Sequence, residues 1–393
     1  MQLYNTLSLT KEPFVPREGA VRIYVCGITP YDVTHLGHAF SYVFYDTLRR
    51  YLESNGHAVD FVQNITDVDD DIIRKAAELG QPVEEVVAVN VADFDRDMAA
   101  LNVRPPTHYP RASDQIERIQ GIVQALLDSG HAYVKGGDVF FRTSSFPEFG
   151  ALSHRRGDGL ISDTEPLRLR DRMNEPRDFT LWQESLPGEL HWPSPWGEGR
   201  PGWHIECAAM STRYLGTPVD IHGGGSDLIF PHHESEIAQV VSYTGEQPFV
   251  RFWVHNGMLR IAGEKMSKSL KNLILAKDLL KRYTATTIRA YLLSSHYRAE
   301  PEYSEEALAE WAPRIEYLRG ALEAGGGPGP DLDAAPFRVR FKAALDDDMD
   351  TPRALDVLGE LASTAIAAGE RGSTIAPARD TLRELAGVLG LRL

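Results

Sequence analysis

Cysteine is scarce in this chain, since only Cys26 and Cys207 occur among 393 residues. So few thiols exclude a framework of several disulfides. No uninterrupted apolar run reaches the roughly 18 residues that a membrane span needs, so we predict no membrane-spanning helix. The opening residues, MQLYNTLSLTKEPF, lack the basic segment and apolar core of a signal peptide. We therefore expect a cytoplasmic protein that contacts no membrane.

Lys and Arg are also few relative to Asp and Glu. The 41 Lys and Arg residues face 56 Asp and Glu residues, which gives a formal net charge of −15. This balance excludes a broad basic surface, so any RNA must bind a local basic patch. The rest of the composition, 42% hydrophobic and 25% charged, is ordinary for a globular protein. The length predicts two to four domains of roughly 100–200 residues each.

The segment 26–38, CGITPYDVTHLGH, lies between a predicted strand over 21–25 and an amphipathic helix that begins after it. In an open parallel sheet, ligands bind in such loops, outside the carboxyl ends of the strands. His35 and His38 are three residues apart and can face one ligand, while Gly37 lets a ring or phosphate approach the backbone. The helix N-terminus favours a phosphate. The alternative for the two histidines is ordinary surface polarity.

A run of aspartates, NITDVDDD over 64–71, follows a second predicted strand. These carboxylates either cap the helix that starts at IIRKAAELG or bind a cation. We favour capping, because the following run is a good helix and acidic side chains complement the N-terminal end of its dipole.

Both cysteines lie in motif-like segments. Cys26 follows the first strand, and Cys207 lies in GWHIEC. His232 and Glu236 are four residues apart at the start of a helix, so their side chains share one face. Two thiolates, an imidazole and a carboxylate make a plausible zinc-binding set. Buried structural cysteines are the alternative.

Two further loops suit phosphate groups. Gly223, Gly224 and Gly225 follow a predicted strand end and allow a ligand close to the backbone, although turn geometry alone explains a glycine triplet equally well. Lys265 and Lys268, in GEKMSKSLKN, suit a polyphosphate or the transition state of adenylyl transfer. A solvated basic loop is the alternative for the two lysines.

Taken together, these motifs resemble the cysteinyl-tRNA synthetases, a family of class I aminoacyl-tRNA synthetases. The segments HLGH at 35–38 and KMSKS at 265–269 resemble the two class I signatures. Between them NITDVDD, GWHIEC, DIHGGGSDLIFPHHE and SEIAQ occur in the order of that family. The resemblance implies an α/β fold: a Rossmann-like parallel-sheet catalytic core with an inserted domain, followed by a helical bundle.

The domain organisation follows the same resemblance. We expect the first half of the catalytic domain over 1–110, an insertion over 111–198, and the second half with the zinc site over 199–260. The KMSKS loop and a stem-contact region then span 261–323, and a C-terminal helical domain spans 324–393.

The resemblance also implies roles for individual residues. The expected zinc ligands are Cys26, Cys207, His232 and Glu236, and Thr29 and Trp203 are expected to contact the substrate cysteine. His35 and His38 would stabilise the ATP phosphates, and Lys265 and Lys268 the pyrophosphate in the transition state. The expected ATP-binding residues are Gly37, Gly223, Gly224, Gly225, Asp227 and Lys268. The implied partners are L-cysteine, ATP with Mg²⁺, and tRNA(Cys), with one Zn²⁺ per chain and a monomeric protein.

The sequence leaves more than one acceptor for the activated cysteine open. Cysteinyl-tRNA synthetases usually continue into a small anticodon-binding domain, which we expect this chain to lack. The related mycothiol-pathway ligases, which join cysteine to a glucosaminyl-inositol, also lack it. Glu236, the opening LYNTLSLTKEPF and the segment KMSKSLKN favour the tRNA ligase. Asp71 and Lys271 depart from its pattern, where Lys and Gly are usual. A non-catalytic paralogue is a third alternative, and it predicts lost signature residues.

Overall fold

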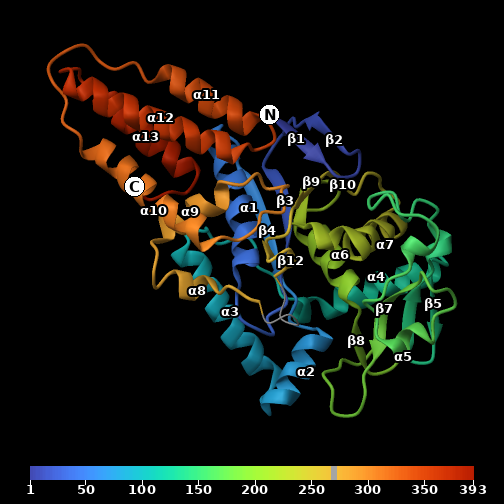
Figure 1. Ribbon diagram of the computed structural model, residues 1–393. Helices are drawn as coiled ribbons and strands as arrows, with labels where there is room; N and C mark the ends of the chain where they lie inside the picture. The colour runs from blue at the N-terminus through green and yellow to red at the C-terminus, as the bar shows by residue number, and fades with distance from the viewer. Residues whose placement is uncertain (267–271) are drawn as a thin grey trace.

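A central parallel sheet organises the computed structural model, which describes residues 1–266 and 272–393 (Figure 1). Its strands are β3 (Val21–Ile28), β4 (Val59–Ile65), β9 (Val219–Gly225) and β10 (Val250–Asn256). They lie in the order β10-β9-β3-β4, and each neighbouring pair is parallel. The strand order reverses between β3 and β9, which is the position where such sheets bind ligands. The predicted α/β Rossmann-like core is confirmed.

Strand β3 is buried on both faces, because helices cover both sides of the sheet. Val21, Ile23 and Val25 pack into one hydrophobic core with α1 (Leu36–Ser54). Tyr24 and Cys26 alternate with them and pack into a second core. This second core includes side chains of α6 (Trp203–Tyr214) and α7 (Glu234–Thr244). The two-residue period of a strand therefore directs Tyr24 and Cys26 toward α6 and α7.

Helix α1 begins at Leu36, three residues earlier than the sequence predicts, so His38 lies inside the helix and not in the loop before it. His35 is the N-cap residue and has an extended backbone, with φ −107° and ψ 168°. Phe40, Phe44 and Leu48 recur at helical spacing and are buried. Phe44 stacks on Tyr297 with ring centroids 4.1 Å apart, which anchors α1 against the C-terminal half of the chain.

An inserted unit separates the two halves of the sheet. Before it, helices α2 (Asp70–Leu79) and α3 (Val83–Ala100) pack into the same core as α1 and β3. The inserted unit itself begins with α4 (Ile116–Asp128). An antiparallel sheet in the order β5-β6-β7-β8 follows, with the short helix α5 (Leu167–Arg170) before β7. Its strands are β5 (Ala132–Lys135), β6 (Asp138–Phe141), β7 (Phe179–Glu184) and β8 (Gly199–Pro201). Helix α4 contacts α6 and α7, so the insertion rests beside the second core (Figure 1).

Two small hairpins flank the core. The first, β1 (Gln2–Asn5) with β2 (Thr10–Pro13), is antiparallel and packs beside β10. The second pairs β11 (Arg260–Ile261) with β12 (Glu264–Lys265). It leads the chain from the end of β10 toward the helical region.

The C-terminal region is helical, as predicted. Its helices are α8 (Ala276–Leu279), α9 (Ala285–Leu293), α10 (Glu305–Glu323), α11 (Ala335–Asp346), α12 (Thr351–Glu370) and α13 (Ala376–Val388). Helix α12 contacts α10, α11 and α13, and α9 contacts α1 (Figure 1). None of the helices in the described residues is long and apolar enough to cross a membrane.

A buried ion pair ties this region to α1. The guanidinium of Arg289, in α9, donates to the carboxylate of Asp46, and both side chains are almost fully buried. Arg50 donates to the same carboxylate at 2.7 Å. Arg289 also donates to the carbonyl oxygens of Leu389 at 2.6 Å and Leu101 at 3.1 Å. We call Asp46, Arg50 and Arg289 the balanced cluster, because the buried carboxylate meets cations within the protein.

Candidate active site and metal cluster

A cleft of about 730 Å³ opens at the carboxyl ends of β3, β9 and β10. Most of the residues that the sequence singles out line it. These are Cys26, Thr29, His35, Gly37, His38, Trp203, Cys207, Gly224, Gly225, Asp227 and His232. The structure thus brings together segments that are up to two hundred positions apart in the sequence.

The HLGH segment forms the first turn of α1 at the edge of this cleft. The rings of His35 and His38 stack with centroids 3.8 Å apart. Gly37 permits this, since a Cβ there would lie 3.0 Å from atoms of the His35 ring. The backbone N–H of Leu36 donates to the Ile274 carbonyl at 2.7 Å, which fixes this turn to the chain beyond the KMSKS segment.

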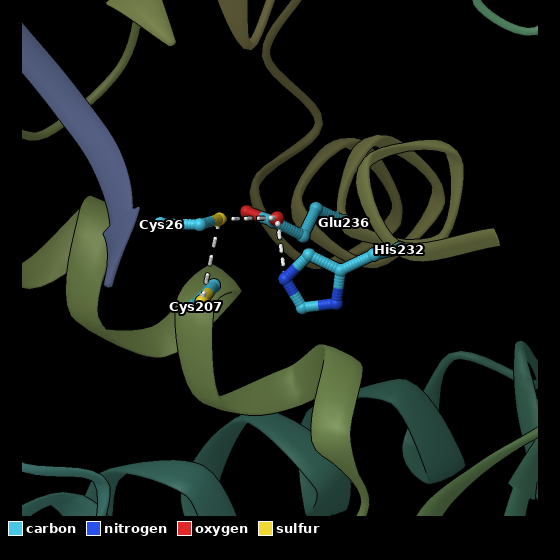
Figure 2. A group of neighbouring side chains, drawn as sticks. All are labelled: Cys26, Cys207, His232 and Glu236. Atoms are coloured by element: carbon cyan, nitrogen blue, oxygen red, sulfur yellow. Dashed lines mark hydrogen bonds and ion pairs between the residues drawn. The ribbon is translucent and has the colours of Figure 1, made fainter. Parts of the chain in front are cut away.

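Cys26, Cys207, His232 and Glu236 converge beneath the cleft, and we call them the donor cluster (Figure 2). One potential ligand atom from each lies within 4.8 Å of the others. The two sulfurs are 3.8 Å apart, and His232 Nε2 is 3.2 Å from Glu236 Oε1. Cys26 comes from β3 and Cys207 from α6, while His232 and Glu236 come from η5 (Ile229–His233) and α7.

Burial dominates the electrostatics of the donor cluster. It raises the pKa of the Cys26 thiol and of the Glu236 carboxyl, and it lowers the pKa of the His232 imidazole. Each shift favours the neutral form of its group. The cluster itself therefore contains electron-pair donors and no cation. A buried set of two sulfurs, an imidazole and a carboxylate has the donor chemistry that suits Zn²⁺.

Four further histidines surround the donor cluster, and the sequence analysis gave none of them a role. His204 Nδ1 lies 3.0 Å from His232 Nδ1. His222 Nε2 lies 3.0 Å from Glu236 Oε2, and His233 Nε2 lies 3.2 Å from the Cys26 sulfur. His233 Nδ1 in turn lies 2.7 Å from His255 Nε2. Cys26, His222, His233 and Glu236 form a second group whose ligand atoms also lie within 4.8 Å. Only the first group contains both thiols.

Trp203 lies where the cleft meets the donor cluster, and Thr29 also lines the cleft. The Trp203 ring stacks on the His232 imidazole with centroids 4.3 Å apart. Trp203 is the first residue of α6, the helix that also carries Cys207. A single helix therefore sets the position of an aromatic wall of the cleft relative to one of the sulfurs.

The glycine triplet at the end of β9 has a packing role in addition to any ligand role. A Cβ at Gly223 would approach the Tyr45 ring to 2.4 Å. The Tyr45 hydroxyl accepts from the Gly224 N–H at 2.7 Å and donates to the Val254 carbonyl at 2.8 Å. Gly224 and Gly225 line the cleft. The space over Gly223 is filled by Tyr45, so its glycine is explained by α1 packing against the sheet.

The aspartate run caps α2, as predicted. Asp69 is the N-cap residue and accepts from the Asp71 N–H at 2.7 Å. Asp70 binds Arg200 and Asp71 binds Arg74, each at 2.6 Å. Burial raises the pKa of Asp69 to about 7. These protein contacts explain the carboxylates without a cation.

The described residues include only part of the KMSKS segment. Lys268 lies outside the described residues, and for Lys265 the structure describes the backbone alone, in β12. Met266 is buried and lines the cleft. The proposed roles of both lysines therefore rest on the sequence.

Comparisons with known proteins give the family. The tRNA synthetases class I (C) catalytic domain matches residues 13–312, and the DALR domain matches residues 340–393. The cysteine–tRNA ligase of Alkalilimnicola ehrlichii is 48% identical over 399 residues, which span 100% of this chain and 85% of that protein. The cysteine–tRNA ligase of Dehalococcoides mccartyi (strain 195) is 44% identical and is covered to 86%.

Solved structures agree on the fold. Mycobacterium tuberculosis methionyl-tRNA synthetase, in complex with methionyl-adenylate, superimposes with a TM-score of 0.68 at 19% identity and covers 94% of this chain and 89% of its own. These comparisons do not favour the amino-sugar ligase. The catalytic-domain match covers most of the chain, and the full-length similarity is to tRNA ligases. The chain therefore belongs to the cysteine–tRNA ligase family of class I synthetases, the ligases that form aminoacyl-tRNA.

Proposed function

We propose that the chain activates L-cysteine with ATP, transfers it to tRNA(Cys), and selects the amino acid by its thiol at a zinc ion. The donor cluster carries this proposal: the only two sulfurs of cysteine in the chain lie 3.8 Å apart below the cleft. Cysteine and serine differ by sulfur in place of oxygen, and a shape-matched pocket separates such similar molecules poorly. A bound Zn²⁺ supplies the missing discrimination, because it binds thiolate and lowers the pKa of the thiol.

Cys26, Cys207, His232 and Glu236 would hold the metal. Four protein ligands leave no open position in a tetrahedral site, so the substrate thiolate must add as a fifth ligand or displace one of the four. We infer that Glu236 is the ligand that loosens. Its second oxygen already has a partner in His222 at 3.0 Å, which keeps the buried carboxylate hydrogen-bonded when its other oxygen is released.

The remaining residues position the amino acid and ATP. Thr29 and Trp203 would contact the cysteine. His35, His38 and Gly37 would receive the ATP phosphates at the start of α1, where N–H groups and the helix dipole favour negative charge. Gly223 to Gly225 and Asp227 would hold the nucleoside, and Lys265 and Lys268 the pyrophosphate, with Mg²⁺ bound to ATP. Attack of the cysteine carboxylate on the α-phosphorus then gives cysteinyl-adenylate and pyrophosphate, a step that depends on positioning and charge stabilisation.

We also infer how the chain is organised around this reaction. Residues 1–110 and 199–260 would form the two halves of the catalytic domain, with the insertion over 111–198. Residues 261–323 would contact the tRNA stem, ahead of a helical domain over 324–393. Both cysteines are free thiols, which accords with a reducing, cytoplasmic compartment. A monomeric state stays a prediction.

Metal analysis combined with cysteine-dependent pyrophosphate exchange tests the proposal. We expect one zinc per chain, exchange with cysteine and little with serine, and charging of tRNA(Cys). Cys207→Ser should lose zinc and most of the discrimination against serine. Ser211→Ala is the matched control, because Ser211 is buried one turn further along α6 and its hydroxyl bonds a backbone carbonyl. Full zinc occupancy in Cys207→Ser would contradict the ligand set.

A further inference from the structure

The Tyr24 hydroxyl is a buried polar group without a hydrogen-bond partner among the described residues. Tyr24 lies two residues before Cys26 in β3, so both side chains leave the strand on the same face. Its ring lies 4.9 Å from that of His222, the imidazole that contacts Glu236. The residue is fully buried in the same core as both cysteines. A phenol in this position either only fills space in the core or donates a hydrogen bond in another state of the protein.

The acidic groups around Tyr24 identify that partner. Burial raises the pKa of the Tyr24 hydroxyl, and Cys207, Cys26 and Glu236 raise the pKa further. A phenol is protonated at neutral pH, so the Tyr24 hydroxyl can donate a hydrogen bond to a negatively charged neighbour. Thiols are weak acceptors, whereas a thiolate is a charged acceptor that forms stronger hydrogen bonds. The hydroxyl therefore gains a good partner only when the cysteines are deprotonated.

Cys207 needs such a donor more than Cys26 does. The Cys26 sulfur already has an imidazole nitrogen, His233 Nε2, at 3.2 Å. The Cys207 sulfur lies 3.7 Å from Asn64 Oδ1, and the Gly27 N–H donates to that oxygen at 2.8 Å. An amide oxygen is an acceptor and cannot stabilise a thiolate. Tyr24 lies in the same buried core as Cys207 and on the same strand face as Cys26, so its hydroxyl is the donor that we assign to this sulfur.

We propose that the Tyr24 hydroxyl is a positioning donor that bonds the Cys207 thiolate in the metal-loaded protein and thereby sharpens selection of the substrate thiol. This inference rests on the zinc site proposed above. A dication with two thiolates, one carboxylate and a neutral imidazole carries one net negative charge, and a substrate thiolate adds another. Negative charge in a buried site is costly, and a hydrogen bond donated to a ligand sulfur stabilises the negative charge on that sulfur.

Tyr24→Phe tests this role, with Tyr42→Phe as the matched control. Tyr42 is also a buried tyrosine beside the site, but its hydroxyl donates to the backbone carbonyl of Cys26 at 3.2 Å. The probes are zinc affinity, measured by competition with a chelating dye, and the sulfur-to-metal charge-transfer band of the Co²⁺-substituted protein. We expect Tyr24→Phe to weaken zinc binding by about 10–100-fold and to shift the band, as loss of a group that hydrogen-bonds a metal ligand does. Tyr42→Phe should leave the band in place.

The metal-free protein gives an independent readout. Because the hydroxyl has no partner there, Tyr24→Phe should leave the thermal midpoint of the metal-free protein unchanged or raise it, while lowering that of the zinc-bound protein. An unchanged cobalt spectrum and zinc affinity would overturn the proposal, and so would a variant that fails to fold without metal. If the wild-type chain itself binds neither zinc nor cobalt, the zinc site proposed above fails instead.

Discussion

Asp46 and Glu236 are both buried carboxylic acids, and their surroundings move their pKa values in opposite directions. Burial alone would raise the pKa of each. At Asp46 the guanidinium groups of Arg289 and Arg50 outweigh burial and hold the pKa below its usual value. At Glu236 burial prevails and the pKa is raised, although a hydrogen bond from Cys26 opposes it. Asp46 lies on the side of the sheet that α1 covers. Glu236 lies on the opposite side, which α6 and α7 cover.

The comparison separates an ion pair that is complete within the protein from a buried cluster whose donor atoms are compatible with a metal ion. In the balanced cluster the positive charge is supplied by side chains, so its role is to join α1 to the C-terminal region. In the donor cluster, burial shifts the pKa values of the Cys26 thiol, the His232 imidazole and the Glu236 carboxyl toward their neutral forms. Burying ionisable groups that have no counter-charge is expensive, and a chain that does so beside a cleft gains when a metal ion enters.

Arg289→Met should produce the largest loss of stability. It leaves the Asp46 carboxylate buried with Arg50 and Arg104 as its remaining charged partners, and removing one member of a buried pair costs about 3–5 kcal/mol. We expect the free energy of unfolding to fall by an amount near the lower end of that range, measured from the midpoint of urea denaturation. The double variant Asp46→Leu/Arg289→Met should recover most of the loss, since an apolar replacement of a buried pair is often neutral.

The control for Arg289→Met is an exposed pair. Arg383 lies 3.0 Å from Asp380 in α13, and their side chains are 62% and 75% exposed. Arg383→Met should change stability by at most about 0.5 kcal/mol. Equal losses from the two variants would show that burial does not set the value of the Asp46 contact.

Glu236→Gln should have the next largest effect, and its sign should depend on the metal. The variant should weaken zinc binding by more than about 100-fold, because it removes a charged ligand and not merely a neighbour of one. Without metal, the same substitution should instead stabilise the folded protein. The raised pKa means that folded wild-type protein retains a proton that the unfolded chain releases, so this group lowers stability as pH rises above about 4.3. Metal-free Glu236→Gln should therefore become more stable relative to wild type between pH 5 and 8, measured by chelator-treated thermal unfolding.

The sequence could reveal the donor cluster but not the balanced one. Two scarce cysteines and a His–Glu pair at helical spacing are local signals, and strand alternation with helix periodicity places β3 and α1. Asp69 as the N-cap of α2 was also readable, because the helix-forming run follows it directly. Arg289 sits in TTIRAYLL with nothing local to show that its charge is buried. Its partner lies 243 positions earlier in the chain, a separation that only tertiary packing resolves.

His222 is a residue of the site itself that the sequence did not reveal. Its substitution has the smallest effect that we predict. Its ring is held by stacking on Trp253 at 4.6 Å, and its Nε2 meets Glu236 Oε2 at 3.0 Å, contacts that arise from three different elements. His222→Phe keeps an aromatic ring against Trp253 and removes only the contact to the carboxylate. We expect zinc affinity to fall by about 10–100-fold, less than for Glu236→Gln, because a neighbour that orients a ligand is lost while the ligand remains. If the two variants lost zinc equally, His222 would have to be a ligand itself, and the second group of Cys26, His222, His233 and Glu236 would be the metal site.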